Sequence, residues 1–341
     1  MQPRAQASIS PTEQQPPQNG LLGLGNVLLD VVLQISDEEF DDLHLGLPRG
    51  QVRRVSAAEQ RSLLARFPKD RINRCPGGSC ANVLRSYAWH GLPARLLGLA
   101  GDDEAADFLG NALHDAGVDT SGILRCGGHA TDTCLVFVTP EGERTMLPCF
   151  DAGSCIRPDS FSEADLNGFY ALHLEGYNLR FPEALAGILA MARRRRLRLS
   201  WDLGDASLVH DFYNKLYKSL IINNLECIFG NLGEASALTG CTNPRDAAEA
   251  LGHLASCAVV TCGAQGAWLC QNRHPEPNPL IASIASVKPH RLVDTVGAGD
   301  SFVGTFLAKY HSGKSAMEAL EAAAEFASQV VALPGATLPS K

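Results

Sequence analysis

The feature that most constrains the fold is a repeated alternation of apolar, strand-like runs with helical segments. ARLLGLAG reads as a buried strand, and DEAADFLGNALHDAG, which follows it, reads as an amphipathic helix that ends at Gly117. The same alternation resumes in PEALAGILAMARRRRLRLSWDL and in DAAEALGHLASCAVVTCGAQGAWLC. Alternating units imply right-handed crossover connections and a mostly parallel sheet. The pattern therefore predicts a three-layer α/β/α fold, with helices on both faces of the sheet.

Two segments lack this rhythm. Residues 126–150, CGGHATDTCLVFVTPEGERTMLPCF, alternate in period two around the turn PEGE, which is typical of a β-hairpin. Residues 34–56, QISDEEFDDLHLGLPRGQVRRVS, show no clean helical stripe. We expect both segments to belong to a small sheet outside the main layer. Residues 1–19 are rich in Pro, Gln and Ser and poor in large apolar side chains, so we expect a disordered tail there.

Charge and cysteine usage exclude several classes of protein. The 341 residues carry a formal net charge of −8, which argues against a general binder of nucleic acid or of anionic membranes. The 11 cysteines include no Cys-x-x-Cys pair and no histidine spacing typical of zinc, so we expect reduced thiols. The odd cysteine count, the lack of a signal peptide and the lack of an apolar run long enough to span a bilayer favour a cytoplasmic protein.

The stretch DTVGAGDSFVGTF, residues 294–306, carries the clearest chemistry in the chain. Its glycines precede a helical segment, so the amides of Gly297, Ala298 and Gly299 can converge on an anion at the positive end of that helix. The spacing matches neither the Walker pattern nor the dinucleotide fingerprint. Asp300, on the first turn, can accept a proton from an alcohol held against the anion site. Taken alone, an aspartate at this position is more often a helix N-terminal acid with no catalytic role.

Six motifs occur in an order that resembles the PfkB family of carbohydrate and nucleoside kinases, also called the ribokinase family. DTVGAGDSFVGTF resembles the C-terminal signature of that family, and PGGSCANVLRSYAWHG resembles the N-terminal one. The other four motifs are LGLAGDDEAADFLGNALHDAGV, FGNLGEA, TCGAQGA and ASQVVALPGA. The resemblance covers nearly the whole chain after the tail. It implies a ribokinase-like fold with a small β lid, and transfer of the γ-phosphoryl group of ATP to an alcohol.

The resemblance assigns the phosphoryl-transfer chemistry to the last glycine motif. Asp300 would be the general base, and the amides of residues 297–299 would form the anion hole. Asp294 and Thr295 occupy positions that, in similar proteins, shape the nucleotide side of the site and a site for a monovalent cation such as K⁺. Helix capping is the alternative role for these two residues.

Two further motifs would hold the nucleotide. Asn231 and Glu234, in FGNLGEA, match the motif that holds Mg²⁺ and its waters near the phosphates, and oxygen ligands suit this ion. Thr261, Gly263 and Gly266, in TCGAQGA, match the turn whose backbone lies along ATP. Without the resemblance, this second stretch reads as a strand end with turn glycines.

The acceptor would bind next to the first strands. By resemblance, Asp30 would bind sugar hydroxyls. An acid within LLDVVL would otherwise be a costly buried charge, which supports this role. Gly77, Gly78 and Asn82 would give close approach and further hydrogen bonds. Arg144, in GERTM, matches a lid arginine that approaches the phosphates, and a solvated turn arginine is the alternative.

The resemblance also implies how the chain is organised. Residues 20–341 would form one kinase domain, with lid segments at about 33–56 and 123–150 inserted in it. A closed lid would exclude water, which otherwise competes as the phosphoryl acceptor. We expect a small-molecule nucleoside or sugar as the partner, no nucleic acid or membrane, and a monomer or homodimer.

The identity of the acceptor stays open at this level. GLGNVLLDV, the spacing GGS-x-x-N and FDDLHLGLPRGQ resemble adenosine kinases, which favours an adenosine-like nucleoside. A purine would need an aromatic stacking partner in the lid. The candidates are Phe40, Phe137 and Phe150. EGYNL, however, resembles a segment of sugar kinases, so a free sugar such as ribose, fructose or a keto-deoxy sugar is the alternative.

Two other classes of protein fit the sequence less well. A non-catalytic regulatory protein with a ribokinase fold should have lost the base or the anion-hole glycines, and this chain retains both. A nicotinamide-dependent oxidoreductase shares the alternating pattern but requires Gly-x-Gly-x-x-Gly after its first strand, which is missing.

Overall fold

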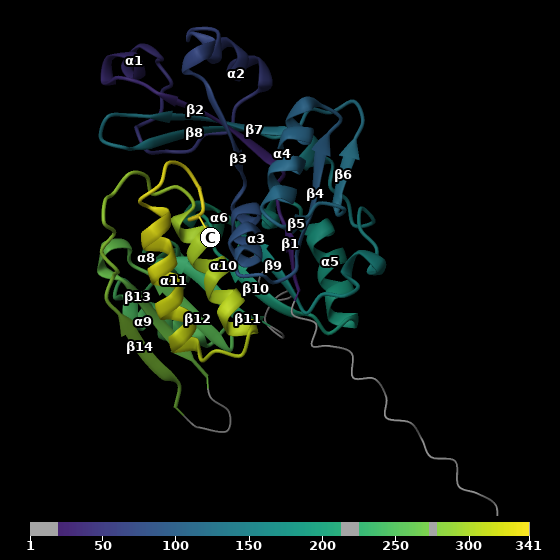
Figure 1. The fold of residues 1–341 in the computed structure, drawn as a ribbon, viewed down its shortest axis with the longest axis vertical. Coiled ribbons are helices and arrows are strands. Elements are labelled where there is room, and N and C mark those ends of the chain that lie inside the picture. Colours follow the sequence, from purple (N-terminus) through teal and green to yellow (C-terminus); the bar gives the residue numbers. More distant parts are fainter. Residues whose placement is uncertain (1–19, 213–224, 273–277, 341) are drawn as a thin grey trace, which may run out of the picture.

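The computed structural model describes residues 20–212, 225–272 and 278–340. Within these ranges the chain forms a large sheet covered by helices and a smaller sheet set over one end of it (Figure 1). The tail expected at residues 1–19 lies outside the described residues. So does nearly all of FYNKLYKSL, residues 212–220, where the alternation was also expected to continue.

The large sheet is mostly parallel. Its strands are β1 (Leu21–Leu24), β4 (Ala94–Gly101), β5 (Val118–Asp119), β6 (Ile123–Cys126), β9 (Ala171–Glu175), β10 (Arg198–Asp202), β11 (Leu225–Asn231), β12 (Cys257–Thr261), β13 (Ala267–Gln271) and β14 (Leu280–Ile284). They run in the order β14-β13-β12-β11-β10-β9-β1-β4-β5, and β6 also pairs with β4. In the described part of this sheet, only β13 runs in the opposite direction, so its pairings with β12 and β14 are antiparallel. The order confirms the crossover connections predicted from the alternation.

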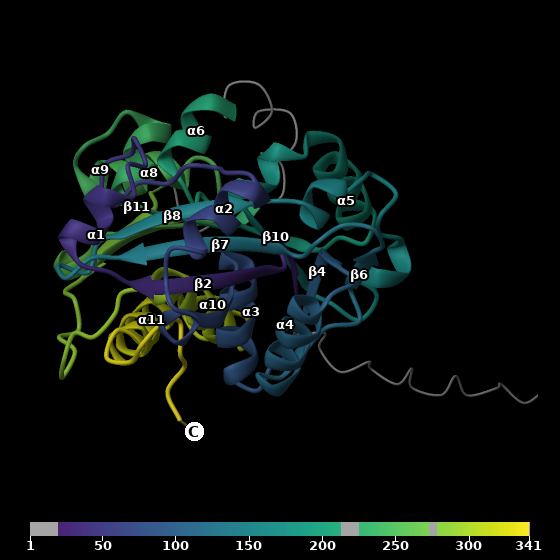
Figure 2. The same ribbon diagram turned by 90° about the horizontal axis from the view of Figure 1, so that it is seen from above.

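Helices cover both faces of the large sheet (Figure 2). One face carries α3 (Ser79–Trp89), α4 (Glu104–Asp115), α10 (Ala298–His311) and α11 (Ala316–Val330). The other carries α5 (Pro182–Arg194), α6 (Ala206–Phe212), α8 (Leu232–Thr239) and α9 (Pro244–Gly252). Each face has its own apolar core, with Phe306 fully buried in one and Trp201 nearly so in the other. The three-layer α/β/α fold is therefore confirmed.

Helix α10 packs unusually closely against α3. Residues Ser301 to Ala308 of α10 are all buried, because the helix lies between the sheet and its two helical neighbours. At Gly304, an added Cβ would lie only 2.3 Å from the carbonyl oxygen of Val83 in α3. Glycine therefore permits a backbone separation that any side chain would prevent. This contact fixes the start of α10 relative to the start of α3.

The small sheet lies over the carboxyl end of the large one (Figure 1). Its strands, in the order β3-β2-β7-β8, are β2 (Leu28–Gln34), β3 (Asn73–Gly77), β7 (Asp132–Val138) and β8 (Arg144–Cys149). The hairpin expected around PEGE is present as the antiparallel pair β7 and β8. In β2, Leu29, Val31 and Leu33 are buried on one face, whereas Asp30 lies on the other. The period-two pattern of a strand thus directs the carboxylate away from the apolar core.

The small sheet does not coincide with residues 33–56 and 123–150. Strand β3 lies outside both segments, and β6, inside the second, pairs with β4 of the large sheet. Residues 34–56 contain a short helix, α1 (Asp37–Asp42), and α2 (Ala57–Leu64) follows. Each begins at a serine whose hydroxyl accepts an N–H three residues later, from Glu39 and Glu59 respectively. The Ser-x-x-Glu spacing of a capped helix start was the overlooked signal.

Short 3-10 turns complete the described structure: η1 (Lys69–Arg71), η2 (Ala152–Cys155), η3 (Glu163–Leu166), η4 (Gly176–Arg180) and η6 (Gly263–Gln265). In the described part of the chain, no helix combines the length and apolarity needed to cross a membrane.

Candidate active site

Four neighbouring parallel strands end in polar residues at one edge of the large sheet. Strands β9 and β10 end at Glu175 and Asp202, which are opposite each other in the register. Strands β11 and β12 end at Asn231 and Thr261, which are also paired. In open α/β sheets, ligands bind outside the carboxyl ends of the strands. Asp300 interacts electrostatically with the first two carboxylates, so the start of α10 faces the same edge.

Asp300 is held by two donors from α3. The Ser79 hydroxyl donates to Oδ1 at 2.8 Å, and the Asn82 side-chain amide donates to Oδ2 at 2.9 Å. The two donors are three residues apart, so they lie on the same face of the first turn of α3. Burial raises the pKa of Asp300, and the bonds from Asn82 and Ser79 oppose that rise. The carboxylate is therefore fixed in place before any ligand arrives.

The backbone at the start of α10 is open toward the site. Gly297 is the N-cap and has a φ of 70°, a left-handed conformation that favours glycine. A Cβ added at Gly297 would lie 2.5 Å from the Cβ of Ala336, so a side chain is excluded. At Gly299, by contrast, no described atom lies within 4 Å of an added Cβ. The amide of Gly299 therefore lies at the positive helix end next to open space, whereas the N–H of Ala298 already donates to the carbonyl oxygen of Thr295 at 3.3 Å.

Asp30 faces this site from the small sheet. Burial raises the pKa of its carboxyl to about 7, Arg144 lowers it, and Asp300 raises it further. On the paired strand β3, a Cβ added at Gly77 would lie 2.5 Å from the Asp30 carboxyl carbon. Glycine therefore leaves room for the carboxylate. Among the described residues, none donates a hydrogen bond to the Asp30 side chain.

Three more carboxyls at the sheet edge have raised pKa values. Burial raises the pKa of Glu175 to about 8, although the N–H of Cys80 donates to it at 2.8 Å. Burial also raises the pKa of Asp202 well above its usual value, and the nearby Glu234 and Asp300 add to the rise. Glu234 itself has a pKa of about 7 for the same leading reason. Like charges gathered in a desolvated place favour protonation or a bound cation.

Asn231 and Glu234 form a reciprocal cap at the start of α8. The N–H of Glu234 donates to the Asn231 side-chain oxygen at 2.9 Å, and the N–H of Asn231 donates to Glu234 Oε2 at 2.8 Å. The Asn231 amide also donates to Glu234 Oε1 at 2.7 Å. The pair is therefore locked by its own hydrogen bonds, and each carboxylate oxygen keeps further lone pairs that could accept a bond.

Arg144 and Asp294 join the small sheet to the loop before α10. The Arg144 guanidinium pairs with Asp294 Oδ1, and both side chains are mostly buried. Asp294 also accepts the N–H of Val296 at 2.9 Å and that of Gly335 at 2.8 Å. The aspartate thus shapes the glycine loop from inside, while Thr295 is exposed. Arg144 is therefore an engaged ion-pair partner, and the alternative of a solvated turn arginine is wrong.

The remaining predicted residues lie at turns. Thr261 ends β12, and the turn from Gly263 to Gly266 connects it to β13. Gly266 adopts a φ of 94°. Gly78 is the N-cap of α3 and directly precedes Ser79. The predicted residues thus fall on two sides: Asp30, Gly77, Gly78, Asn82 and Asp300 with the α10 amides, and Asn231, Glu234, Thr261, Gly263 and Gly266 along the ends of β11 and β12.

Sequence reasoning missed three residues of this site. Glu175 and Asp202 end neighbouring parallel strands, and the rule that ligands bind at carboxyl strand ends would have found them. No role was expected for Ser79, whereas its hydroxyl donates to Asp300. No local pattern indicates that contact, because 221 residues separate the two in the chain.

Comparison with known proteins gives consistent matches. Residues 65–341 match the family described as pfkB family carbohydrate kinase. The chain is 28% identical over 247 residues to the aminoimidazole riboside kinase of Salmonella typhimurium, covering 69% of this chain and 73% of that protein. It is 23% identical over 346 residues to adenosine kinase 2 of Arabidopsis thaliana, covering 94% and 96% respectively.

A solved structure of an adenosine kinase has a similar fold. The adenosine kinase from Sinorhizobium meliloti superposes with a TM-score of 0.83 at 24% identity, covering 95% of this chain and 97% of the other. The family match covers well over half of the chain and includes α3, the sheet edge and α10. The chain therefore belongs to the pfkB family of carbohydrate kinases and is a phosphotransferase with an alcohol group of a nucleoside or sugar as its acceptor.

Proposed function

We propose that the protein transfers the γ-phosphoryl group of ATP to the primary hydroxyl of an adenosine-like nucleoside, with Asp300 as the general base. The observation that carries this proposal is the Asp300 carboxylate, fixed by Ser79 and Asn82 at the start of a helix. A carboxylate in this position takes the proton of the attacking hydroxyl. The amides of residues 297–299 stabilise the charge on the transferring phosphoryl group.

Asp30 binds and orients the acceptor in this proposal. Its carboxylate has no donor among the described residues, so the hydroxyls of a sugar ring supply the missing hydrogen bonds. Gly77 and Gly78 allow the acceptor to approach the backbone between β3 and α3. Asn82 acts mainly as a positioning residue, because its amide is already committed to Asp300.

The nucleotide occupies the other side of the site. Thr261, Gly263 and Gly266 offer backbone along the donor, and Arg144 and Asp294 hold the loop next to the phosphates. Mg²⁺ fits beside Asn231 and Glu234, because burial, together with the nearby charges of Asp205 and Asp300, raises the pKa of Glu234, and a divalent cation favours its ionised form. When bound, Mg²⁺ neutralises phosphate charge. A monovalent cation such as K⁺ near Asp294 and Thr295 also belongs to the proposal.

Two observations favour a nucleoside. Both relatives described above carry names that specify a riboside or adenosine as the acceptor. Of the three candidate aromatic residues, Phe40 and Phe137 are buried in the core, whereas Phe150 is half-buried at the end of β8. Phe150 therefore has the exposed ring area that a nucleobase could contact.

One observation favours a free sugar instead. The guanidinium groups of Arg54 and Arg180 lie 5.5 Å and 4.6 Å from the centre of the Phe150 ring. Two cations next to this ring suit an acceptor that carries its own negative charge, such as a keto-deoxy sugar acid. In that case Phe150 would orient the arginines rather than stack on a base.

The experiment that tests the proposal is ADP release from Mg-ATP with a panel of acceptors. The panel contains purine and pyrimidine nucleosides, ribose, fructose and keto-deoxy sugar acids. Turnover confined to nucleosides supports the proposal, and turnover confined to a sugar acid supports the second candidate. No turnover with any acceptor, with intact ATP binding, would contradict both.

A further inference from the structure

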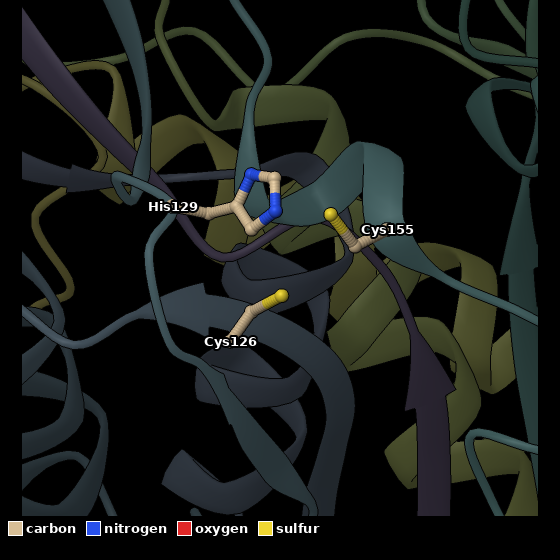
Figure 3. A group of neighbouring side chains, drawn as sticks. All are labelled: Cys126, His129 and Cys155. Carbon is tan, nitrogen blue, oxygen red and sulfur yellow. The ribbon is translucent and has the colours of Figure 1, made fainter.

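Two cysteines and a histidine converge on the side of the molecule where the small sheet joins the large one. Cys126, His129 and Cys155 each offer one ligand atom, and these three atoms lie within 4.8 Å of one another (Figure 3). Figure 3 shows both thiol groups and one nitrogen of the imidazole turned toward a shared point. The cysteines are half-buried and His129 is exposed, so an ion can reach them from solvent.

Three separate segments bring these side chains together. Cys126 is the last residue of β6, on the large sheet. His129 lies in the loop that leads into β7 of the small sheet, and Cys155 is the last residue of η2, which follows β8. The spacing between the two cysteines follows no zinc pattern, which is why the sequence did not indicate the cluster.

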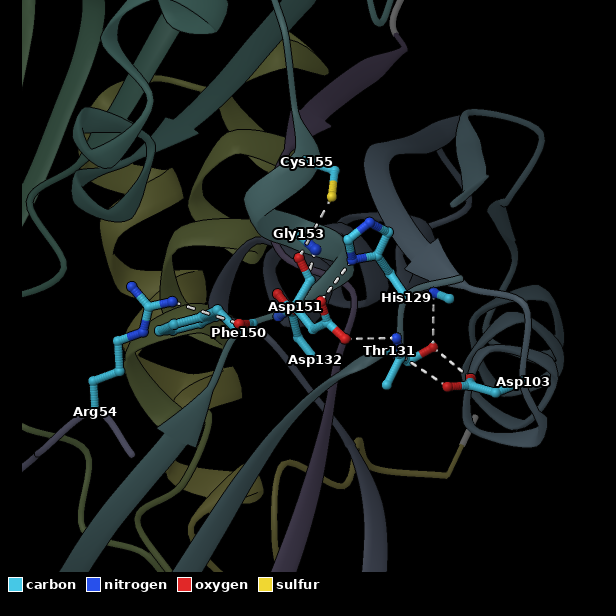
Figure 4. Close-up of polar contacts among 11 residues, drawn as sticks. Arg54, Asp103, His129, Thr131, Asp132, Phe150, Asp151, Gly153 and Cys155 are labelled. Carbon is cyan, nitrogen blue, oxygen red and sulfur yellow. Dashed lines mark hydrogen bonds and ion pairs between the residues drawn. The ribbon is translucent and has the colours of Figure 1, made fainter. Parts of the chain in front are cut away.

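Asp151 fixes the orientation of the histidine. Its Oδ1 lies 2.7 Å from His129 Nδ1, and its Oδ2 accepts the N–H of Ala130 at 2.8 Å (Figure 4). The N–H of Asp151 in turn donates to Asp132 Oδ1 at 2.8 Å. With Nδ1–H bonded to a carboxylate, Nε2 carries the free lone pair. Metal-binding histidines are typically held by a carboxylate in this way.

We propose that Cys126, His129 and Cys155 form a binding site for a thiophilic divalent cation of the Zn²⁺ class. Two thiolates and Nε2 supply three ligands, and water takes the fourth tetrahedral position. Binding converts two thiols to thiolates, releases two protons to solvent and changes no oxidation state. Tetrahedral zinc separates its sulfur and nitrogen ligands by about 3.5–4 Å, so a contraction of at most about 1.3 Å from the observed 4.8 Å completes the site.

The site ties the two sheets together. Cys126 lies on β6 of the large sheet, His129 lies in the segment that leads into β7, and Cys155 lies in the segment that follows β8. A bound ion therefore limits the movement of the small sheet relative to the large one. None of its three ligands is a hydrogen-bond partner of Asp300, and the site has no role in the proposed phosphoryl transfer.

The test is titration of the reduced full-length protein with Co²⁺, which reports on its ligands by absorption. We expect one Co²⁺ per chain, a thiolate-to-metal charge-transfer band, displacement by Zn²⁺ and a rise in Tm with Zn²⁺. Cys126→Ser and Cys155→Ser should lose the band and the rise in Tm. Cys241→Ser, a half-buried cysteine near α8, is the matched control and should retain both.

Asp151→Asn tests the positioning of the histidine. Loss of its carboxylate should weaken Co²⁺ binding on the order of 10-fold to 100-fold without removing the thiolate band. Several results would overturn the site: no band in the reduced wild-type protein, an equal band in Cys155→Ser, or a Cys126–Cys155 disulfide in the purified protein with no cation bound after reduction.

Discussion

Asp30 on the small sheet and Asp300 on α10 have pKa values raised by the same cause, burial, yet they are held in different ways. Asp300 accepts hydrogen bonds from Ser79 and Asn82. Asp30 has only the more distant charge of Arg144 to offset its burial. The carboxylate of Asp300, between α3 and α10, thus has its hydrogen-bond donors in place. The carboxylate of Asp30, on the small sheet, has none among the described residues.

This difference separates binding from chemistry. A buried carboxylate without hydrogen-bond donors has an unfavourable free energy. A ligand whose hydroxyls donate to it removes this penalty, and the gain in free energy appears as binding affinity. A base that must act in a transition state gains instead from being oriented beforehand. The comparison therefore predicts that changes at Asp300 alter turnover, whereas changes at Asp30 alter acceptor affinity as well.

The largest effect is expected from Asp300→Asn. The amide cannot take the proton of the attacking hydroxyl, so kcat should fall on the order of 10²- to 10⁴-fold. The nucleotide dissociation constant and the unfolding temperature should stay near wild type. Asp246→Asn, which changes an exposed first-turn acid of α9, is the control and should keep full activity. An Asp300→Asn enzyme within a few-fold of wild type would defeat the assignment of the base.

The next effect is expected from Asp30→Asn, which keeps the shape that Gly77 accommodates. A hydrogen bond to a charged group contributes about 1.5–3 kcal/mol, so the acceptor KM should rise roughly 10- to 100-fold. The KM for ATP should change little. Asp42→Asn, at the exposed end of α1, is the matched control on the small-sheet side. Unchanged acceptor KM together with reduced kcat would mean that the two aspartates share the chemical role.

Removal of one donor to Asp300 sharpens the comparison further. The Ser79 hydrogen bond lowers the pKa of Asp300, so Ser79→Ala should raise that pKa. The acidic limb of the kcat profile should then move to higher pH, with kcat at neutral pH reduced roughly 10-fold. Ser86→Ala is the matched control, because Ser86 lies on the same helix and its buried hydroxyl has no partner among the described residues. Equal profiles for the two variants would contradict the positioning role of Ser79.

The last prediction concerns protein stability and Glu175. Its pKa rises from 4.5 to about 8 on burial, so the folded protein binds a proton that the unfolded chain releases. The stabilisation is complete below about pH 4.5 and is lost as pH rises toward 8, at most about 1.4 kcal/mol per pH unit. Glu175→Gln should flatten this decline in the free energy of unfolding, measured in urea from pH 5 to pH 8. A slope that is unchanged by the substitution would assign the proton to another group.

The sequence pattern of each segment predicted the helices and strands, but not which residues of different segments come into contact. The periodicity of ARLLGLAG and of the helix after it gave the layers, because each segment carries its own burial pattern. The glycine motif before α10 was visible for the same reason. The contact of Ser79 with Asp300 was not, since it depends on how closely α3 and α10 pack at Gly304.

The small sheet was the hardest part to predict. Its strand β3, NRCPG, contains proline and arginine and has no apolar alternation, so it reads as a loop. Pairing with β2 makes it a strand, and that partner lies about forty residues away. Glu175 and Asp202, at the ends of β9 and β10, were not predicted for a similar reason. Their place at the site depends on the pairing of the two strands and not on the sequence around each residue.

The junction between β3 and α3 has a consequence for how this enzyme can vary. Strand β3 ends at Gly77, which lies against the Asp30 carboxylate, and α3 begins at Ser79, which donates to Asp300. Only one residue separates Gly77 from Ser79. Each residue of a helix turns it by about 100°. An insertion of one residue inside the first turn, between Ser79 and Asn82, would carry one donor off the shared face. A change in the length of this stretch would therefore break the register between the acceptor side and the base, whereas substitution of a single residue would leave that register in place.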